Sequence, residues 1–227
     1  MFKKWIYFLP LVLSAQPHGG KAVSGTAEFS HQGSHCHVHA SDRAVIHWDQ
    51  FGVGQGETLS FIQPGSNSSV LNRVTGQTIS EINGLLQANG RVFLINPNGI
   101  LIGPEGMIQT GGFLASTLDL IANPFDPESP LGFEGREGSL TNLGYIRGEE
   151  WVCLISPNIV NKGTIEGGSV AMASSHSVLV RPRSNETIWV EIQESKGTNP
   201  FSQAINLNGT VRANSLSCEG GGDCSQS

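Results

Sequence analysis

The chain has 227 residues, of which 14% are charged and 29 are glycines, and its formal net charge is −6. The charged fraction is well below the roughly 25% of ordinary soluble domains. The acidic balance and the lack of any Lys or Arg run argue against nucleic acid as a partner. Few charges combined with many Gly, Asn, Ser and Thr residues favour short strands joined by tight turns.

The N-terminus is typical of an export signal. Two lysines precede an apolar run from Trp5 to Leu13, which is too short to span a bilayer as a helix. We therefore predict a signal peptide over residues 1–22, with cleavage after Ala15 and cleavage after Ala22 both open. The alternative is a buried N-terminal strand or helix.

Short strands bounded by Gly or Asn-Gly recur along the chain, as in an all-β protein. The nearest candidate for an amphipathic helix is residues 79–86. Asn83-Gly84 interrupts this segment, and glycine weakens a helix interior. We therefore predict an all-β fold.

The first polar cluster is rich in histidine. On a strand, His35, His37 and His39 share one face, where three imidazoles can converge on a metal. The same alternation suits an exposed hairpin, and no second ligand group with zinc spacing follows. We therefore expect no metal site and no cofactor.

The most distinctive stretch begins with the apolar run 92–95, which is typical of a strand buried on both faces. A turn follows, in which the Asn96 side chain can cap the backbone and Pro97 presets φ. Asn98 suits the next position, and Gly99 accepts a positive φ at the end. These residues predict a type I turn followed by a bulge.

A weak internal repeat follows. The segment 142–146 resembles 161–165, nineteen positions later (161 − 142), and 208–211 resembles a further copy. About twenty residues is one coil of a parallel β-helix, in which coils stack at about 4.8 Å. The asparagines at matching positions, Asn142 and Asn161, predict a hydrogen-bonded ladder at the turns. The alternative is an antiparallel sandwich with coincidentally similar turns.

Catalytic motifs are missing from the sequence. No G-x-S-x-G, H-E-x-x-H or Walker pattern occurs. Some parallel β-helices are polysaccharide enzymes with paired acids, and the dense acidic spots here are 134–137 and 149–150. We interpret both as surface loops, and predict that the chain is not an enzyme.

The last residues, 216–227, are Gly-rich and hold Cys218 and Cys224 on either side of Glu-Gly-Gly-Gly-Asp. In an oxidising compartment these two cysteines could form a disulfide, and two free thiols in a loose tail are the alternative. Cys153 lies in an apolar run and is expected in the core.

Several motifs stand in a characteristic order along the chain. They are Phe61-Ile62-Gln63-Pro64, Leu71-Asn72-Arg73-Val74 (LNRV), Gln87-Ala88-Asn89-Gly90 and Asn96-Pro97-Asn98-Gly99-Ile100 (NPNGI). Together they resemble the N-terminal domain of filamentous haemagglutinins and related two-partner secretion exoproteins. The resemblance begins near Ala44 and is strongest through Asp119.

The resemblance implies both a fold and a role. The fold would be a right-handed parallel β-helix with an N-terminal cap and strands outside the helix, here over residues 23–215. The domain would follow a Sec signal and be recognised by an outer-membrane transporter that carries periplasmic POTRA domains. The protein would then be secreted or held at the cell surface.

The resemblance also carries over residues. The family's NPNGI motif falls on Asn96, Pro97, Asn98, Gly99 and Ile100. Some members have an earlier NPNL motif, which is missing here, and LNRV (Leu71, Asn72, Arg73, Val74) resembles the branch without it. NPNGI could be a contact for the transporter or a structural turn, and its chemistry favours the turn.

Beyond export, three functions remain open from the sequence. The chain could be the first module of an adhesin, haemolysin or toxin. It could also be a small stand-alone adhesin or truncated form that binds a host-cell or glycan surface. A β-helical polysaccharide enzyme is the third, for which we find no convergent acids.

Overall fold

The computed structural model describes residues 16–121, 125, 131–135, 137–182, 188–192 and 204–219. These residues form strands, turns and connecting segments, and none of them belongs to a helix that could cross a membrane. The segment 79–86, weighed as a helix, forms the strands β7 and β8 instead. Residues 1–15 of the predicted signal peptide lie outside the described residues.

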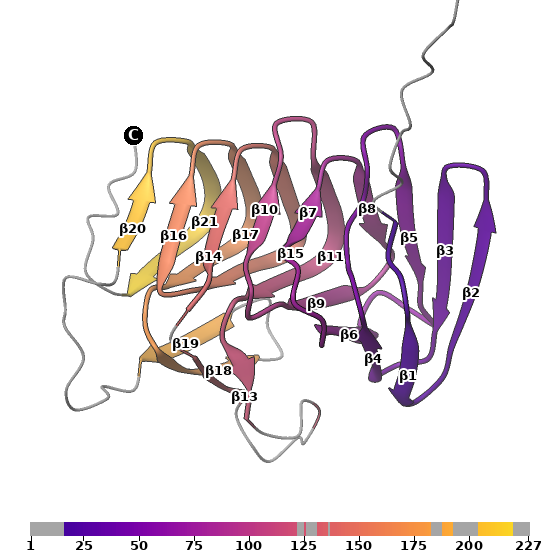
Figure 1. Cartoon of the computed structure of the whole chain (residues 1–227). Coiled ribbons are helices and arrows are strands. Elements are labelled where there is room, and N and C mark those ends of the chain that lie inside the picture. Colours follow the sequence, from indigo (N-terminus) through magenta and orange to yellow (C-terminus); the bar gives the residue numbers. More distant parts are fainter. Residues whose placement is uncertain are drawn as a thin grey trace, which may run out of the picture.

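The strands form three sheets (Figure 1). The 12-stranded sheet contains β1 (Lys21–Ser24), β2 (Ala27–Gln32), β3 (His35–Ala40), β4 (Ala44–Trp48), β5 (Thr58–Ile62), β6 (Ser69–Val74), β8 (Leu85–Ala88), β9 (Arg91–Ile95), β11 (Met107–Ser116), β15 (Tyr145–Ile155), β17 (Thr164–Ala173) and β21 (Thr210–Glu219). The five-stranded sheet contains β7 (Ser80–Ile82), β10 (Ile100–Ile102), β14 (Ser139–Asn142), β16 (Asn158–Asn161) and β20 (Ala204–Leu207). The four-stranded sheet contains β12 (Asp119–Leu120), β13 (Leu131–Glu134), β18 (Ser177–Pro182) and β19 (Ile188–Ile192).

The two larger sheets wind into a parallel β-helix, as the sequence predicts. Strand β11 pairs with β8 through its first residues and with β9 through its last ones, so one long strand covers two faces of the coil. The register shifts between Thr110 and Gly112, where the strand bends. Glycine in a strand commonly marks such a bend or a bulge. The strands β15, β17 and β21 repeat this arrangement.

The nineteen-residue repeat corresponds to one coil. Tyr145 pairs with Thr164 and Asn142 with Asn161, and Thr164 pairs in turn with Thr210. The predicted asparagine ladder has one rung, in which Asn142 Nδ2 donates to Asn161 Oδ1 at 2.8 Å. It ends there, because Leu207 lies opposite Asn161.

A corner of the coil is built from stacked glycines. A Cβ at Gly144 would overlap the carbonyl oxygens of Gly103 and Gly106, and a Cβ at Gly163 would overlap the carbonyl oxygen of Gly144. The next coil also donates a hydrogen bond here, since Thr164 N–H donates to Gly144 O at 2.8 Å. Successive coils therefore approach so closely that no side chain fits between them.

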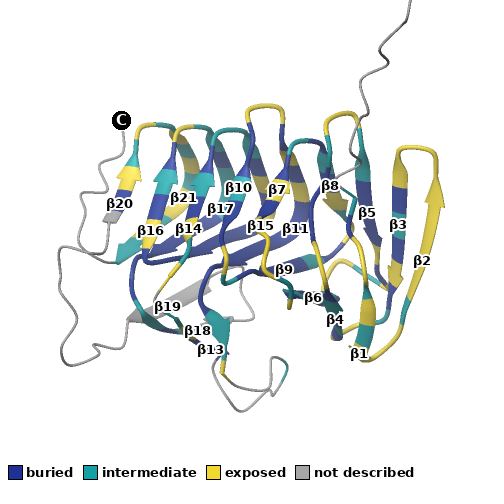
Figure 2. Cartoon of the chain, viewed as in Figure 1, coloured by how far each residue is buried: buried dark blue, intermediate teal, exposed yellow. Residues whose placement is uncertain are grey.

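The buried residues, dark blue in Figure 2, form two hydrophobic cores. Val92 and Leu94 point into the coil, where they join the interior core. Phe93 and Ile95 point outward and belong to a second core, which is covered by the four-stranded sheet. The continuous apolar run 92–95 thus serves a strand that is buried on both faces, as predicted.

The N-terminal end of the coil is closed by antiparallel strands. Strand β1 pairs antiparallel with β4, and β2 with β3, whereas β4 pairs in parallel with β6. Phe29 on β2 packs edge-on against Trp48, with ring centroids 5.3 Å apart. This is the N-terminal cap that the family resemblance implies.

At the other end, β21 continues to Glu219 and so enters the segment that the sequence predicts to be a tail. Cys218, on this strand, takes part in a disulfide bond, while Cys36 and Cys153 are free and buried. Cys224 lies outside the described residues, and its pairing with Cys218 stays a prediction. Cys153 lies in the second core, as expected.

Candidate functional site

The two sequence motifs lie side by side. LNRV is the end of β6 and NPNGI follows β9, and these strands pair in parallel with Arg73 opposite Ile95. The side-chain Nδ2 of Asn98 donates to the carbonyl oxygen of Gly76, just beyond LNRV, at 2.9 Å. The candidate site is therefore one contiguous region at the ends of two neighbouring strands.

The NPNGI turn has the geometry that its residues predict. Gly99 N–H donates to Asn96 O at 3.1 Å, and the φ of Gly99 is 133°. Asn96 Oδ1 accepts from the backbone N–H of Asn98 at 3.0 Å, so the side chain caps the turn. Asn96 Nδ2 donates to Thr78 O and to Ser80 Oγ, both at 2.9 Å. The turn is thus tied to the preceding coil.

Burial separates the motif into structural and accessible parts. Asn96, Gly99 and Ile100 are buried, with Ile100 in the interior core. Pro97 is partly exposed and Asn98 is exposed. A partner protein can therefore reach only the tip of the turn, Pro97 and Asn98, while the other three residues hold its shape.

LNRV is also built into the fold. Leu71 and Val74 point to opposite sides and join different cores. The buried Asn72 accepts a hydrogen bond from Trp48 Nε1 at 2.9 Å and donates to Phe93 O at 3.3 Å. A buried amide with both ends bonded stabilises the coil against the cap. Leu71, Asn72 and Val74 therefore have structural roles.

Arg73 forms a two-pronged ion pair with Asp119. Its Nε donates to Asp119 Oδ1 at 2.8 Å, and Nη2 donates to Oδ2. Both side chains are 35% exposed. Because Asp119 begins the four-stranded sheet, the pair fastens that sheet to the coil. Sequence reasoning does not predict this partnership, because no local pattern links residues 46 positions apart.

The pKa values of this cluster are coupled. Burial by itself raises the pKa of Asp119, but the hydrogen bonds and charge of Arg73, the Leu120 N–H and His47 together lower it below its ordinary value. Burial lowers the pKa of His47, and the charge of Arg73 lowers it further against the opposing effect of Asp119. Both groups therefore favour their deprotonated form in the folded chain.

We expect acid to weaken the fold in two steps. Because the pKa of His47 is lower in the folded chain, His47 stabilises the fold at pH values above about 6.5, the pKa of histidine in the unfolded chain. This stabilisation is lost as the pH falls toward the pKa of folded His47. The contribution of Asp119 is present above about pH 4 and is lost as the pH falls through its lowered pKa. Unfolding free energies measured against pH test this.

Asp119→Asn is the variant for that test. This substitution should lower the free energy of unfolding by about 1 kcal/mol at neutral pH, a small value because solvent screens the partly exposed pair. It should also reduce the loss of stability that occurs below about pH 4. If the acid profile of Asp119→Asn matched that of the original chain, the ion pair would not be the source of the step.

The histidine cluster lies on the cap. His35 and His39 are exposed and His37 is partly exposed, while Cys36 and Val38 on the same strand are buried, so the three imidazoles share one face as predicted. The rings of His35 and His37 stack at 6.3 Å. In the described part of the chain, no group of three His, Cys, Asp or Glu residues is arranged to hold a metal.

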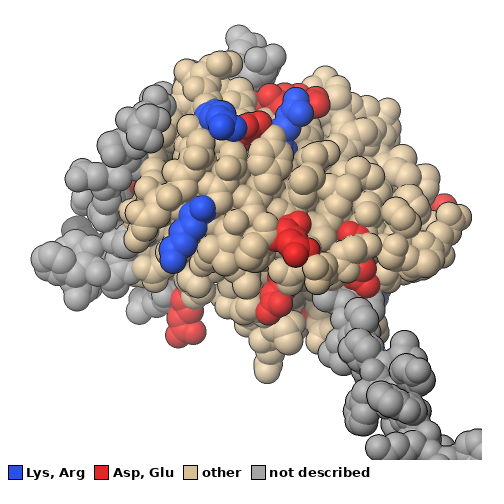
Figure 3. Space-filling view, turned by 90° about the horizontal axis from the view of Figure 1, so that it is seen from above, with Lys and Arg blue, Asp and Glu red and all other residues tan. Residues whose placement is uncertain are grey.

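The acidic spots are at the surface but not all in loops. Glu149 and Glu150 lie at the bend of β15, which runs continuously from Tyr145 to Ile155. Glu150 pairs with Arg91, whose Nε lies 2.8 Å from Glu150 Oε2. Glu134 ends β13 and is exposed. Charged side chains on the face seen in Figure 3 are few and of both signs, with no extended patch of either.

Two heme/hemopexin-binding proteins are similar to the chain. The heme/hemopexin-binding protein of Haemophilus influenzae is 30% identical over 213 residues, which is 88% of this chain and 23% of that protein. Another heme/hemopexin-binding protein of Haemophilus influenzae is 45% identical over 80 residues, or 35% of this chain and 9% of that protein. The chain therefore spans less than a quarter of the length of these relatives.

A solved structure has the same fold. The HMW1 secretion domain from Haemophilus influenzae matches with a TM-score of 0.72 and 30% identity, over 89% of this chain and 57% of that chain. The family described as TPS secretion domain matches residues 15–220. The ordered motifs, the capped parallel β-helix and these matches together establish that the chain belongs to the two-partner secretion (TPS) domain family.

Proposed function

We propose that this chain is the secretion-directing module of a two-partner exoprotein and is recognised by a dedicated outer-membrane transporter through POTRA domains in the periplasm. The family match over residues 15–220 carries this proposal. The module enters the periplasm by the Sec route and ends outside the cell or on its surface. Its role is recognition and folding, and it catalyses no reaction.

Within this proposal, the tip of the NPNGI turn is the transporter contact. Asn98 and Pro97 are accessible, while Asn96, Gly99 and Ile100 shape the turn behind them. Two accessible residues make only a small contact area, so further surface residues beside the turn must also contact the transporter. LNRV supports the turn from the next strand and makes no contact of its own through Leu71, Asn72 or Val74.

The proposed signal cleavage lies before β1. Lys21 and Ala22 pair with His47 and Ile46 on β4, so a cut after Ala22 would remove half of the strand. Cleavage near Ala15 leaves the strand whole. We therefore favour the earlier of the two sites that the sequence leaves open.

Secretion in a Gram-negative host, with and without a cognate two-partner transporter, tests the proposal. We expect the chain in the medium only when the transporter is present, and N-terminal sequencing of the exported chain should begin upstream of Lys21. Retention in the periplasm with every transporter tried would contradict the secretion role. An amino terminus within β1 would contradict the cleavage proposal alone.

A further inference from the structure

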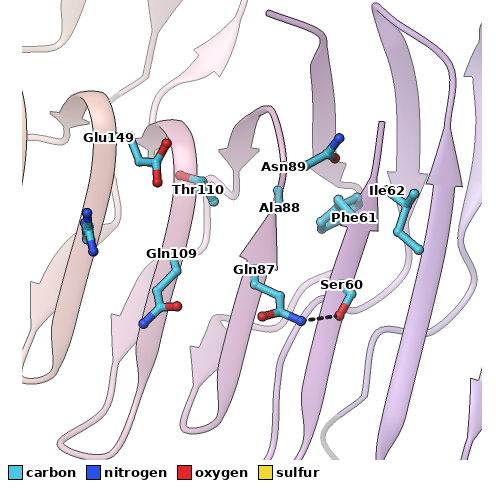
Figure 4. A pocket seen from close by; sticks show the side chains of 10 residues that line it. Ser60, Phe61, Ile62, Gln87, Ala88, Asn89, Gln109, Thr110 and Glu149 are labelled. Atoms are coloured by element: carbon cyan, nitrogen blue, oxygen red, sulfur yellow. Dashed lines mark hydrogen bonds between the residues drawn. The ribbon is translucent and has the colours of Figure 1, made fainter. Parts of the chain in front are cut away.

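A groove of about 520 Å³ lies on the outward face of the first part of the coil (Figure 4). It crosses the strands β5, β8, β11 and β15, which lie side by side in the 12-stranded sheet. Its volume falls in the range of about 300–1,000 Å³ that is usual for ligand sites. The groove is separate from the NPNGI turn and from LNRV, because none of their residues lines it.

Polar side chains form a row along the groove. The strand register places Ser60 beside Gln87, Gln87 beside Gln109, and Gln109 beside Arg147. Parallel strands are spaced at about 4.8 Å, so the row presents a polar group at each such step. These side chains point outward because their neighbours along each strand fill the interior core.

Much of the hydrogen-bonding capacity of this row is unused. Gln87 Nε2 donates to Ser60 Oγ at 2.9 Å, and Gln109 Nε2 contacts only the sulfur of Met107. Side-chain hydrogen bonds lower the pKa of Glu166, which lies beside Arg147 in the register, and the charge of Arg147 helps to lower it further. Arg147 nevertheless forms no ion pair within the described part of the chain. An amide whose donors and acceptors are not all used by the fold can recognise a ligand.

Thr110 supplies a second, independent observation. Its side chain lines the groove, is only 3% exposed, and has a buried hydroxyl with no hydrogen-bond partner. Buried polar atoms without partners are rare and costly. Figure 4 shows Thr110 close to Glu149, on the strand that also carries Gln109.

The chemistry of the groove defines its ligand. Each of the four strands is hydrogen-bonded on both sides, so an extra peptide strand has no backbone partner and recognition must use side chains. Arg147 and Glu149 cancel in charge, which disfavours polyanions. Ile62, 40% exposed, offers an apolar contact for a C–H face. We propose that the groove binds a neutral oligosaccharide.

Titration of the purified chain with neutral manno-, galacto- and gluco-oligosaccharides, followed by NMR and calorimetry, tests the proposal. At least one series should bind and shift the signals of the groove. Gln87→Ala with Gln109→Ala should weaken that binding about tenfold, the effect of losing one or two hydrogen bonds. Asn206→Ala removes an exposed amide from the five-stranded sheet and is the matched control, which should bind as the original chain does.

Thr110→Val separates binding from folding. It replaces an unpartnered buried hydroxyl with a methyl group of similar size, so stability should be unchanged or higher while oligosaccharide affinity falls severalfold. Export of all these variants should match that of the original chain, because the groove lies apart from the proposed transporter contact.

The proposal is overturned if no oligosaccharide series binds, or if the Gln87/Gln109 double variant binds as well as the control. It is equally overturned if the groove variants lose transporter-dependent export and leave sugar binding intact, since the groove would then serve a protein. Failure of export in the original chain would instead count against the secretion role, and it leaves the sugar-binding measurement unaffected.

Discussion

Gly144→Ala is expected to destabilise the folded chain by about 3 kcal/mol, the upper range for an overpacked site. The added Cβ would overlap two carbonyl oxygens of the preceding coil, those of Gly103 and Gly106. Neither oxygen can move freely, because Gly106 O accepts from Tyr145 N–H at 2.9 Å and Gly103 O from Gly106 N–H at 2.9 Å. Relief of the overlap therefore requires the coils to separate. Unfolding in denaturant measures the effect as a lower midpoint.

Gly65→Ala is the matched control for that experiment. A Cβ at Gly65 would meet no atom within 4 Å, and its φ lies outside the left-handed region. The same chemical change in open space should leave the midpoint nearly unchanged. Equal midpoints for the Gly144 and Gly65 variants would show that the corner tolerates a side chain and that close stacking does not constrain it.

Gly99→Val is expected to reduce export severalfold, and much more than Ile108→Val. Gly99 has a φ of 133°, which a β-branched residue adopts only with strain, and its Cβ would lie 3.2 Å from Ile79 Cγ2. Ile108 is fully buried in the interior core, where loss of one methyl costs only about 1 kcal/mol. Export of the two variants in the presence of the transporter measures the difference. Equal export would contradict a structural role for the turn.

Asn98→Ala, measured in the same export assay, distinguishes a role of Asn98 in holding the turn from a direct contact with the transporter. Asn98 is exposed, although its side chain also donates to Gly76 O. If the tip of the turn contacts the transporter, export should fall more than the small change in stability explains. If export and stability fell in proportion, Asn98 would act only by holding the shape of the turn.

Local chemistry explains why the turns were predictable from the sequence. Asn96, Pro97 and Gly99 each favour one backbone position, and the cap and positive φ follow from their identities alone. The coil length was predictable for the same reason, since Asn142 and Asn161 recur at equivalent turns.

Contacts between distant segments were beyond such reasoning. In the third copy of the repeat, the stacked glycines fix Gly209 against Gly163, and this copy is one residue shorter before its glycine. Leu207 therefore takes the place opposite Asn161. Asp119, as the partner of Arg73, was missed because only the folded coil brings the two together.

Strand length was also underestimated. The sequence predicts a surface loop at Glu149-Glu150, whereas β15 runs from Tyr145 to Ile155 through both residues. Its bend keeps the pairing with β11 and β17 on both sides. The register shifts between Gly148 and Trp151, so the ladder is irregular at the bend and regular pairing resumes at Trp151.

The two cores differ in the separation of their contacts along the chain, which sets an order of folding. From β4 to β17, neighbouring coils join residues between 18 (169 − 151) and 40 (140 − 100) positions apart, such as Tyr145 and Thr164. Only the step to β20 and β21 is longer among the described residues, at 46 (210 − 164). In the outer sheet, Phe133 pairs with Val178 across 45 positions (178 − 133). Shorter loops close at a smaller entropic cost. The coil should therefore assemble before its outer sheet docks, and during that interval the outward faces of β9, β11 and β15 form an uncovered apolar strip on which a chaperone, or a second unfinished chain, can bind.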